Sequence, residues 1–364
     1  MKKIVYLFAA GTMALAACTS EPSYKISGTI EGAADGEYVF LQEAKGRELI
    51  KLDSAVIANG AFTFNGRQDA AINRFITYTP AEGKRKMADF FLENGNITIA
   101  LGEENTITGT PNNDAYQAFK KEYTALNKEM RALYEKSKAE GLTEEQNAEI
   151  EKQYEELDAK SNTLIYNTID ANIANPVGIH LFPSYSYQFD LAQQKALVAK
   201  IPAEYLSNER IDKIIKRIEV LEKTAVGQKF TDFEMPTPDG KTLKLSDVIA
   251  KNKYTLIDFW ASWCGPCRRE MPNVVAAYKE FHKKGFGIVG VSLDSKEEDW
   301  KKAIKDLNMT WDHMSDLKYW QCEGAALYGV NSIPATVLVA QDGTIVERNL
   351  RGEAIAEKLK ELLK

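Results

Sequence analysis

The 364-residue sequence predicts three successive parts: a small all-β domain at residues 24–110, a helical connecting region at 113–223 and a mixed α/β domain at 227–364. Three observations predict this division. Apolar and polar residues alternate in the first part, apolar residues recur at spacings of three and four in the second, and short apolar strands alternate with helical segments in the third. A chain of this length exceeds what one core organises, so several domains are expected.

The first part begins with a strand at Tyr24–Ile30, where apolar and polar residues alternate. This period is typical of a strand with one buried face. Asn59-Gly60 and Asn94-Gly95 each separate two apolar runs, and these dipeptides favour the tight turns of β-hairpins. A small antiparallel sheet or sandwich is predicted. No catalytic pattern is visible in it, and we expect it to bind a partner or to act as a spacer.

The second part is predicted to be helical. Apolar residues from Ala115 to Tyr134 form one stripe at helical spacing. Thr143 and Gln146 have the spacing of a capping box that starts a second helix, and Asn175-Pro176 ends it. These stripes are expected to pack against each other or against the flanking domains.

The third part is predicted to alternate strands and helices, with turns at Asp239-Gly240 and Asp342-Gly343. The predicted strands are 230–235, 242–245, 254–259, 287–294, 335–340 and 345–349, and the predicted helices are 267–283, 297–307, 323–328 and a last one from Glu353.

The charge pattern argues against a nucleic-acid partner. The chain has 46 Lys and Arg against 52 Asp and Glu, a net charge of −6, and the two signs are interleaved. No basic patch or stripe is visible, and such a patch is the electrostatic mark of nucleic-acid binding.

Residues 1–18 have the pattern of an export signal. Lys2 and Lys3 precede the apolar run Ile4–Ala17, which is too short to span a bilayer. The ending Leu15-Ala16-Ala17-Cys18 resembles the lipobox of bacterial lipoproteins, which implies cleavage before Cys18 and lipid on its sulfur. An ordinary secretory signal with a chance cysteine is the alternative. We expect a protein of the cell envelope, tied to a membrane through lipid on Cys18 and facing the periplasm.

Cys264 and Cys267 are separated by Gly265-Pro266 between a predicted strand and a predicted helix. Unpaired N–H groups at a helix N-terminus favour a thiolate on the more exposed sulfur, here Cys264. Cys264 is expected to attack a substrate disulfide, and Cys267 to resolve the mixed disulfide that results. The redox-active disulfide needs no further cofactor.

A pair of cysteines two residues apart can also supply half of a zinc site. This chain has no second pair, and His180, His282 and His313 lack ligand spacing, so no metal is expected. The remaining cysteine, Cys322, is expected to be a small buried thiol, with a third redox thiol as the alternative.

The string Trp263-Cys264-Gly265-Pro266-Cys267 is similar to the active-site sequence of thioredoxins. Residues 227–364 resemble a thioredoxin fold of the membrane-anchored, extracytoplasmic TlpA and ResA type. Ile333-Pro334, before an apolar strand, is similar to the cis-proline motif of that family. The resemblance implies that Trp260 and Trp263 shield the disulfide. It also implies that the substrate contacts Trp263, Gly265, Pro266, Ile333 and Pro334.

Two acids complete the resemblance. Asp258, six residues before Cys264, matches the buried aspartate of thioredoxins, and Glu270, six residues after it, matches an acid near the active site of ResA-type reductases. The resemblance implies that one of the two is the base for Cys267. Burial raises the pKa of a carboxyl toward neutrality, which suits this role. For Glu270, an ordinary exposed helix acid is the alternative.

The resemblance implies a thiol–disulfide oxidoreductase that acts as a reductase on exported proteins with disulfides, apo-cytochrome c during haem attachment among them. A membrane-bound electron donor would reduce it again. The all-β part resembles a domain of unknown function in lipoproteins of the Bacteroides group. Two alternatives remain: a binding or scaffolding lipoprotein with a minor redox role, and a thiol peroxidase. The peroxidase pattern Pro-x-x-x-Thr-x-x-Cys is not present at Cys264.

Overall fold

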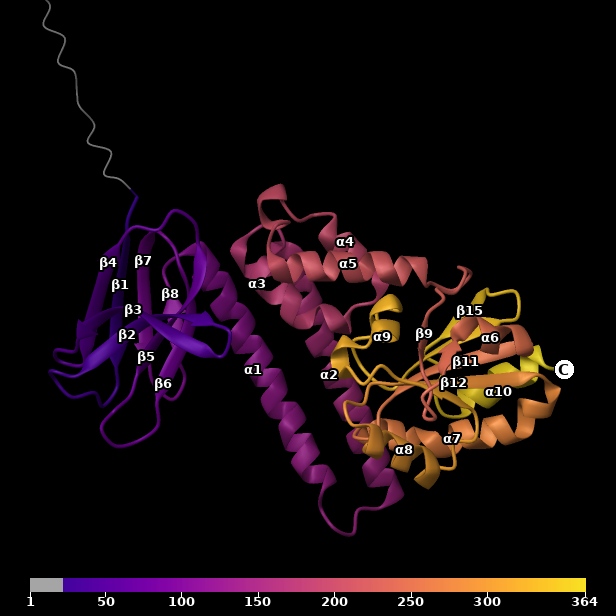
Figure 1. Ribbon diagram of the computed structural model, residues 1–364. Helices are drawn as coiled ribbons and strands as arrows, with labels where there is room; N and C mark the ends of the chain where they lie inside the picture. Colours follow the sequence, from indigo (N-terminus) through magenta and orange to yellow (C-terminus); the bar gives the residue numbers. More distant parts are fainter. Residues whose placement is uncertain (1–21) are drawn as a thin grey trace, which may run out of the picture. The chain divides into compact units, whose positions relative to one another are not determined.

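The computed structural model describes residues 22–364, and Figure 1 shows its helices and strands along the chain. The chain divides into two compact units. One holds the chain up to Gln188 together with Lys200–Pro202, and the other holds Phe189–Ala199 and Ala203–Lys364.

The predicted signal segment 1–18 and the lipid-attachment residue Cys18 lie outside the described residues. Within the described residues, no helix has both the length and the apolar character needed to cross a membrane. Export and lipid attachment therefore stay predictions.

The all-β domain is a sandwich of two sheets, and each sheet has four strands in the part of the chain that the structure describes. One sheet has the order β4-β1-β7-β8 and the other β3-β2-β5-β6. The strands are β1 (Tyr24–Ile30), β2 (Tyr38–Lys45), β3 (Glu48–Val56), β4 (Ala61–Gly66), β5 (Ile72–Tyr78), β6 (Lys86–Leu92), β7 (Gly95–Leu101) and β8 (Thr106–Thr108). Alternate residues of β1, such as Ile26 and Ile30, are buried in a core shared by both sheets. The all-β prediction is confirmed.

The predicted Asn94-Gly95 hairpin is wrong, and the predicted Asn59-Gly60 hairpin is confirmed only at its turn, where Ala58 and Ala61 pair through two backbone hydrogen bonds of 3.0 Å. Asn59 and Gly60 do reverse the chain, with φ of 53° and 70°, but β3 before them and β4 after them belong to different sheets. Asn94-Gly95 likewise connects β6 in one sheet to β7 in the other, and β7 runs parallel to β1. Turn residues specify a reversal, whereas the partner of the next strand depends on where its apolar side chains are buried. Pairing of β4 with β1 buries Phe62 and Phe64 in the core.

Helices occupy the chain between the sandwich and the α/β domain, and the two units share this region. They are α1 (Pro111–Ser137), α2 (Glu144–Asn172), α3 (Pro176–Tyr185), α4 (Leu191–Val198) and α5 (Glu209–Lys223), with 3-10 turns at Ser186–Gln188 and Ala203–Tyr205. The capping box is confirmed: the Gln146 N–H donates to Thr143 Oγ1 at 3.2 Å, and the Thr143 N–H donates to Gln146 Oε1 at 2.9 Å. The predicted stripe of α1 is buried only in part, since Phe119 is covered and Tyr134 is exposed.

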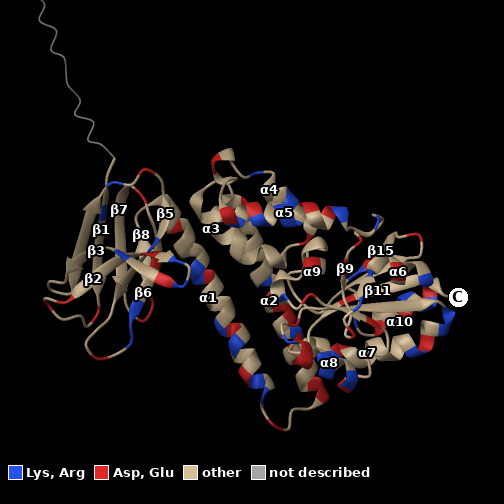
Figure 2. Ribbon diagram, in the orientation of Figure 1, with Lys and Arg blue, Asp and Glu red and all other residues tan. Residues whose placement is uncertain are grey.

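Lys and Arg are interspersed with Asp and Glu along the helices (Figure 2). On α5, Lys213 pairs with Glu209 and Lys216 pairs with Asp212, each at 2.7 Å. These are exposed pairs one helical turn apart, which contribute little to stability. The helices therefore carry a mixed, solvated surface.

The α/β domain contains a mixed sheet with the order β13-β12-β11-β14-β15. Its strands are β11 (Tyr254–Trp260), β12 (Phe286–Ser292), β13 (Asp312–Met314), β14 (Ala335–Ala340) and β15 (Ile345–Arg348), and a separate hairpin joins β9 (Glu234–Pro236) to β10 (Thr242–Lys244). Its helices are α6 (Leu245–Lys251), α7 (Gly265–Phe281), α8 (Glu297–Asp306), α9 (Glu323–Leu327) and α10 (Glu353–Leu362), with 3-10 turns at His282–Lys284 and Tyr319–Gln321. The predicted thioredoxin-like arrangement is confirmed, although α6 and β13 were not predicted.

The central strands of this sheet are buried on both faces. Every residue of β12 is buried, and β11 is buried from Thr255 to Trp260. Such strands consist of near-continuous apolar residues because helices cover both sides of the sheet. Asp258 is the one acidic residue of the otherwise uncharged strand β11. The strand is followed directly by the segment that carries the cysteine pair.

Candidate active site

Cys264 and Cys267 lie at the start of α7. Cys264 caps the helix, Cys267 lies in its first turn, and the two sulfurs are bonded at 2.00 Å. Only 4% of Cys264 and 1% of Cys267 is exposed. The Cys267 backbone N–H donates to Cys264 Sγ at 3.1 Å. After reduction, this donor and the positive end of the helix dipole both favour a thiolate on Cys264.

The reactive sulfur faces the Ile333-Pro334 peptide bond, which is cis. Cys264 Sγ lies 3.7 Å from the carbonyl oxygen of Ile333. Ile333 is half-buried and Pro334 is buried. The other residues predicted to contact substrate are exposed beside the disulfide: Trp263, Gly265 and Pro266. All five thus border the cysteine pair in sequence or in space.

Asp258 is a buried carboxyl in the central strand, with 2% of its surface exposed. Its Oδ2 atom has no hydrogen-bond partner among the described residues. Burial, and then the negative charge of Glu270, raise the pKa of Asp258 to about 7 against the opposing effect of Arg351. Asp258 therefore changes its charge near neutral pH, which is the property that a general base needs.

Glu270 has a different environment. It is half-buried, and its Oε1 accepts a hydrogen bond from the Gly352 backbone N–H at 2.6 Å. Gly352 caps α10, and the adjacent Arg351 donates to the carbonyl oxygen of Pro334. Glu270 therefore ties α7 to the start of α10 beside the cis peptide and is not an exposed helix acid. The negative charge of Glu270 influences the site by raising the pKa of Asp258.

Comparison with protein families divides the chain in the same way. Residues 226–348 match the model of the AhpC/TSA family, and residues 24–116 match the model of a domain of unknown function, DUF4369. Among curated proteins, the thiol-disulfide oxidoreductase ResA of Oceanobacillus iheyensis is 32% identical over 155 residues, which cover 42% of this chain and 74% of ResA. ResA of Bacillus anthracis is 30% identical over 143 residues, 39% of this chain and 79% of that protein. This chain belongs to the ResA-type thiol–disulfide oxidoreductases.

Solved structures of similar proteins align with part of this chain. A thiol-disulfide oxidoreductase from Bacteroides fragilis is 36% identical and aligns over 37% of this chain and 100% of its own, with a TM-score of 0.36. The thioredoxin domain of a thiol-disulfide oxidoreductase from Bacteroides vulgatus is 34% identical over 38% of this chain and 99% of its own, also with a TM-score of 0.36.

Asp294 is a site residue of this oxidoreductase that sequence reasoning missed. It is 1% exposed and follows β12 closely. Its carboxylate accepts hydrogen bonds from the Ser262 backbone N–H at 3.0 Å, from Ser262 Oγ at 2.5 Å and from Ser292 Oγ at 2.7 Å. Asp294 thus fixes the backbone just before Trp263 and Cys264. An acid two residues after a strand of mostly apolar residues was the available signal.

Trp260 and Cys322 belong to the core of the domain. Trp260 is fully buried, and its ring lies 6.1 Å from that of His313. Only Trp263 of the two predicted shielding residues reaches the surface, with 44% exposed. Cys322 is a free thiol with no exposed surface, and burial raises its pKa to about 11. It is a buried neutral thiol at physiological pH, as expected for a structural cysteine.

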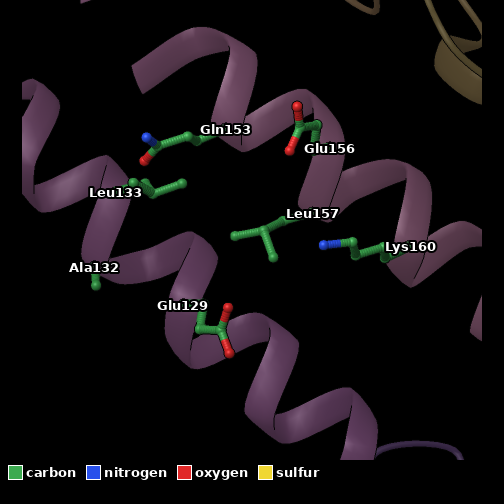
Figure 3. Close-up of a pocket in the computed structure, with 7 residues that line it drawn as sticks. All are labelled: Glu129, Ala132, Leu133, Gln153, Glu156, Leu157 and Lys160. Atoms are coloured by element: carbon green, nitrogen blue, oxygen red, sulfur yellow. The ribbon is translucent and has the colours of Figure 1, made fainter. Parts of the chain in front are cut away.

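A groove of about 350 Å³ lies between α1 and α2, far along the sequence from the cysteine pair. Figure 3 shows its lining: Glu129, Ala132, Leu133, Gln153, Glu156, Leu157 and Lys160. This lining holds no cysteine, serine or histidine and no residue predicted for the redox site. Among residues 22–364, no group of three His, Cys, Asp or Glu side chains is placed to hold a metal ion.

Proposed function

We propose that the protein is a reductase of the cell envelope that transfers two electrons from the Cys264/Cys267 dithiol to disulfides of exported proteins. The observation that carries the proposal is the cysteine pair at the start of α7, 3.7 Å from the Ile333 carbonyl and in the same domain as a carboxyl that titrates near neutrality. The two sulfurs hold both electrons, so that the reaction uses no other cofactor.

The first step is attack on the substrate. The Cys264 thiolate forms a bond to one sulfur of the substrate disulfide, whose S–S bond breaks, and the other substrate sulfur leaves as a thiolate. The Ile333 carbonyl beside Cys264 is available to accept a hydrogen bond from the backbone of an extended substrate segment. Such backbone pairing is insensitive to the substrate's sequence.

The second step is resolution of the mixed disulfide. Cys267 gives up its proton, attacks Cys264 Sγ and releases the remaining substrate sulfur as a thiolate that takes up a proton. Asp258 is proposed to accept the Cys267 proton, since it is buried and its pKa is about 7. Glu270 and Arg351 act on this step as positioning residues, because their charges shift the pKa of Asp258 in opposite directions.

The cycle closes when a dithiol donor reduces Cys264–Cys267 again. A membrane-bound donor is proposed, together with attachment through lipid on Cys18, on the basis of the signal-like sequence at residues 1–18. Apo-cytochrome c belongs to the same proposal as one candidate among exported substrates. The reducing direction rests on the Gly265-Pro266 dipeptide, which is the one found in thioredoxin.

Trapping of the intermediate tests the mechanism. The chain without residues 1–18 is reduced and mixed with a disulfide-bonded protein such as insulin. Cys267→Ser should accumulate a mixed disulfide through Cys264, because the resolving thiol is missing. Cys264→Ser, the matched control, should trap nothing, since Cys267 is 1% exposed. Equal trapping by both variants would show that Cys264 is not the attacking residue.

A further inference from the structure

Three exposed aromatic side chains gather beside the disulfide. Trp263 immediately precedes Cys264, and its ring centroid lies 5.0 Å from that of Tyr319 and 6.1 Å from that of Trp320. The rings of Tyr319 and Trp320 are 6.1 Å apart. Between 41% and 44% of each residue is exposed. These three residues are called the aromatic patch below.

Apart from Val226 at the start of the domain, the aromatic patch contains all the strongly exposed large apolar side chains of its domain. From residue 227 to residue 364, every one of which the structure describes, no other large hydrophobic residue is exposed to this degree. Single exposed apolar residues are normal on a protein surface, whereas a contiguous group marks a binding site. The position of this group next to the reactive sulfur links it to substrate.

Hydrogen bonds hold the patch in place. The Asp316 carboxylate accepts a hydrogen bond from the Lys318 N–H at 3.1 Å and another from the Glu323 N–H at 2.9 Å. These two bonds fix the backbone of the segment that carries Tyr319 and Trp320. Tyr319 has a φ of 56°, a left-handed conformation in which an aromatic residue is strained. Strained residues persist where the surrounding structure fixes them, and they cluster at ligand-binding sites.

We propose that the aromatic patch is a docking surface for an extended polypeptide segment that carries a large apolar side chain close to its disulfide cysteine. This inference rests on the proposed reductase function and names the class of substrate sequence that the site prefers. A cystine seated on Cys264 places its neighbouring residues beside Trp263, which is bonded directly to Cys264. No member of the patch is charged, so that it distinguishes substrates by apolar surface.

The rings suit this role. Tyr and Trp offer large rigid contact areas at a small cost in conformational entropy, and their polar Oη and Nε1 atoms still find partners at a hydrated interface. Tyr319 and Trp320 are therefore specificity-determining residues. The chemical steps at Cys264 and Cys267 do not involve them.

The test compares two disulfide-bonded peptides that differ only in Phe or Ser close to one cysteine. The wild-type chain without residues 1–18 should show a kcat/KM about tenfold higher for the Phe peptide, equivalent to about 1.4 kcal/mol. Trp320→Ala should reduce this preference to about twofold or less, as estimated from the loss of one aromatic contact. Tyr319→Gly should do the same, and glycine accepts the positive φ, so that loss of the ring is separated from misfolding.

Tyr187→Ala is the matched control, since Tyr187 is an exposed aromatic residue of the other unit. It should keep the wild-type preference. Equal kcat/KM for both peptides in the wild type, or an unchanged preference in Trp320→Ala and Tyr319→Gly, would overturn the inference and leave the reductase function intact. Reduction of neither peptide would overturn both. Binding of the wild type to phosphatidylcholine vesicles that Trp320→Ala abolishes, with no peptide preference, would assign the patch to a membrane instead.

Discussion

Replacement of Asp258 by asparagine tests the ionisation of the buried carboxyl at the centre of the site. The ordinary pKa of an aspartate is 3.8, and in the folded domain that of Asp258 is about 7. The native state therefore holds the proton more tightly than the unfolded state. The contribution of Asp258 to the free energy of unfolding is fully present below pH 4, falls as the pH rises from about 4 to about 7, and is constant above that.

The magnitude follows from the two pKa values. At about 1.4 kcal/mol per pKa unit, a rise from 3.8 to about 7 lowers the stability of the wild type by about 4 kcal/mol between pH 4 and pH 8. Asparagine has nearly the same size as aspartate and does not ionise. The free energy of unfolding of Asp258→Asn minus that of the wild type should therefore be about 4 kcal/mol larger at pH 8 than at pH 4.

Urea unfolding of the oxidised chain, followed by tryptophan fluorescence, measures this difference in the relevant domain alone. All five tryptophans lie between residues 260 and 320. Asp299→Asn is the matched control, because Asp299 is an exposed carboxylate of α8. A difference between Asp258→Asn and the wild type that is the same at pH 4 and at pH 8 would refute the reasoning.

Three further variants probe other contacts. Glu270→Gln should lower the pKa of Asp258, because it removes a nearby negative charge, and should move the pH inflection of turnover downward; an unchanged pH profile would contradict this. Cys322→Ala should keep full turnover and lower the unfolding free energy by about 1 kcal/mol, and a tenfold loss of turnover would instead make Cys322 a redox thiol. Tyr328→Phe should lower the unfolding free energy by about 1–3 kcal/mol, since the Tyr328 hydroxyl accepts from the Thr231 N–H and donates to the Thr231 carbonyl; unchanged urea unfolding would show that these bonds contribute nothing.

Local patterns predicted the elements better than they predicted the pairing of strands. The alternation along β1 and the Thr143–Gln146 capping box describe interactions within a few residues, and both are present in the structure. Asn59-Gly60 gave the right reversal and the wrong partner, because pairing depends on burial against distant strands. The short strand β13 was missed for the same reason, since it pairs with β12, from which α8 separates it in the chain.

The candidate site shows the same division. The cysteine pair and Pro334 were visible in the sequence because each lies within a short motif. The hydrogen bond from Gly352 to Glu270 joins residues 82 positions apart, and no local pattern predicts it. No short motif marks Tyr319 and Trp320, and only the folded chain places them beside Trp263.

The measurement that tests the central claim most directly is the reduction potential of Cys264–Cys267. The chain without residues 1–18 is equilibrated in dithiothreitol and glutathione redox buffers, with Cys264→Ser as the control. The account predicts a reversible two-electron couple near that of thioredoxin, about −270 mV. A potential above about −180 mV would make the protein an oxidant or an isomerase and contradict the reducing direction. The absence of a reversible couple would contradict the oxidoreductase mechanism itself.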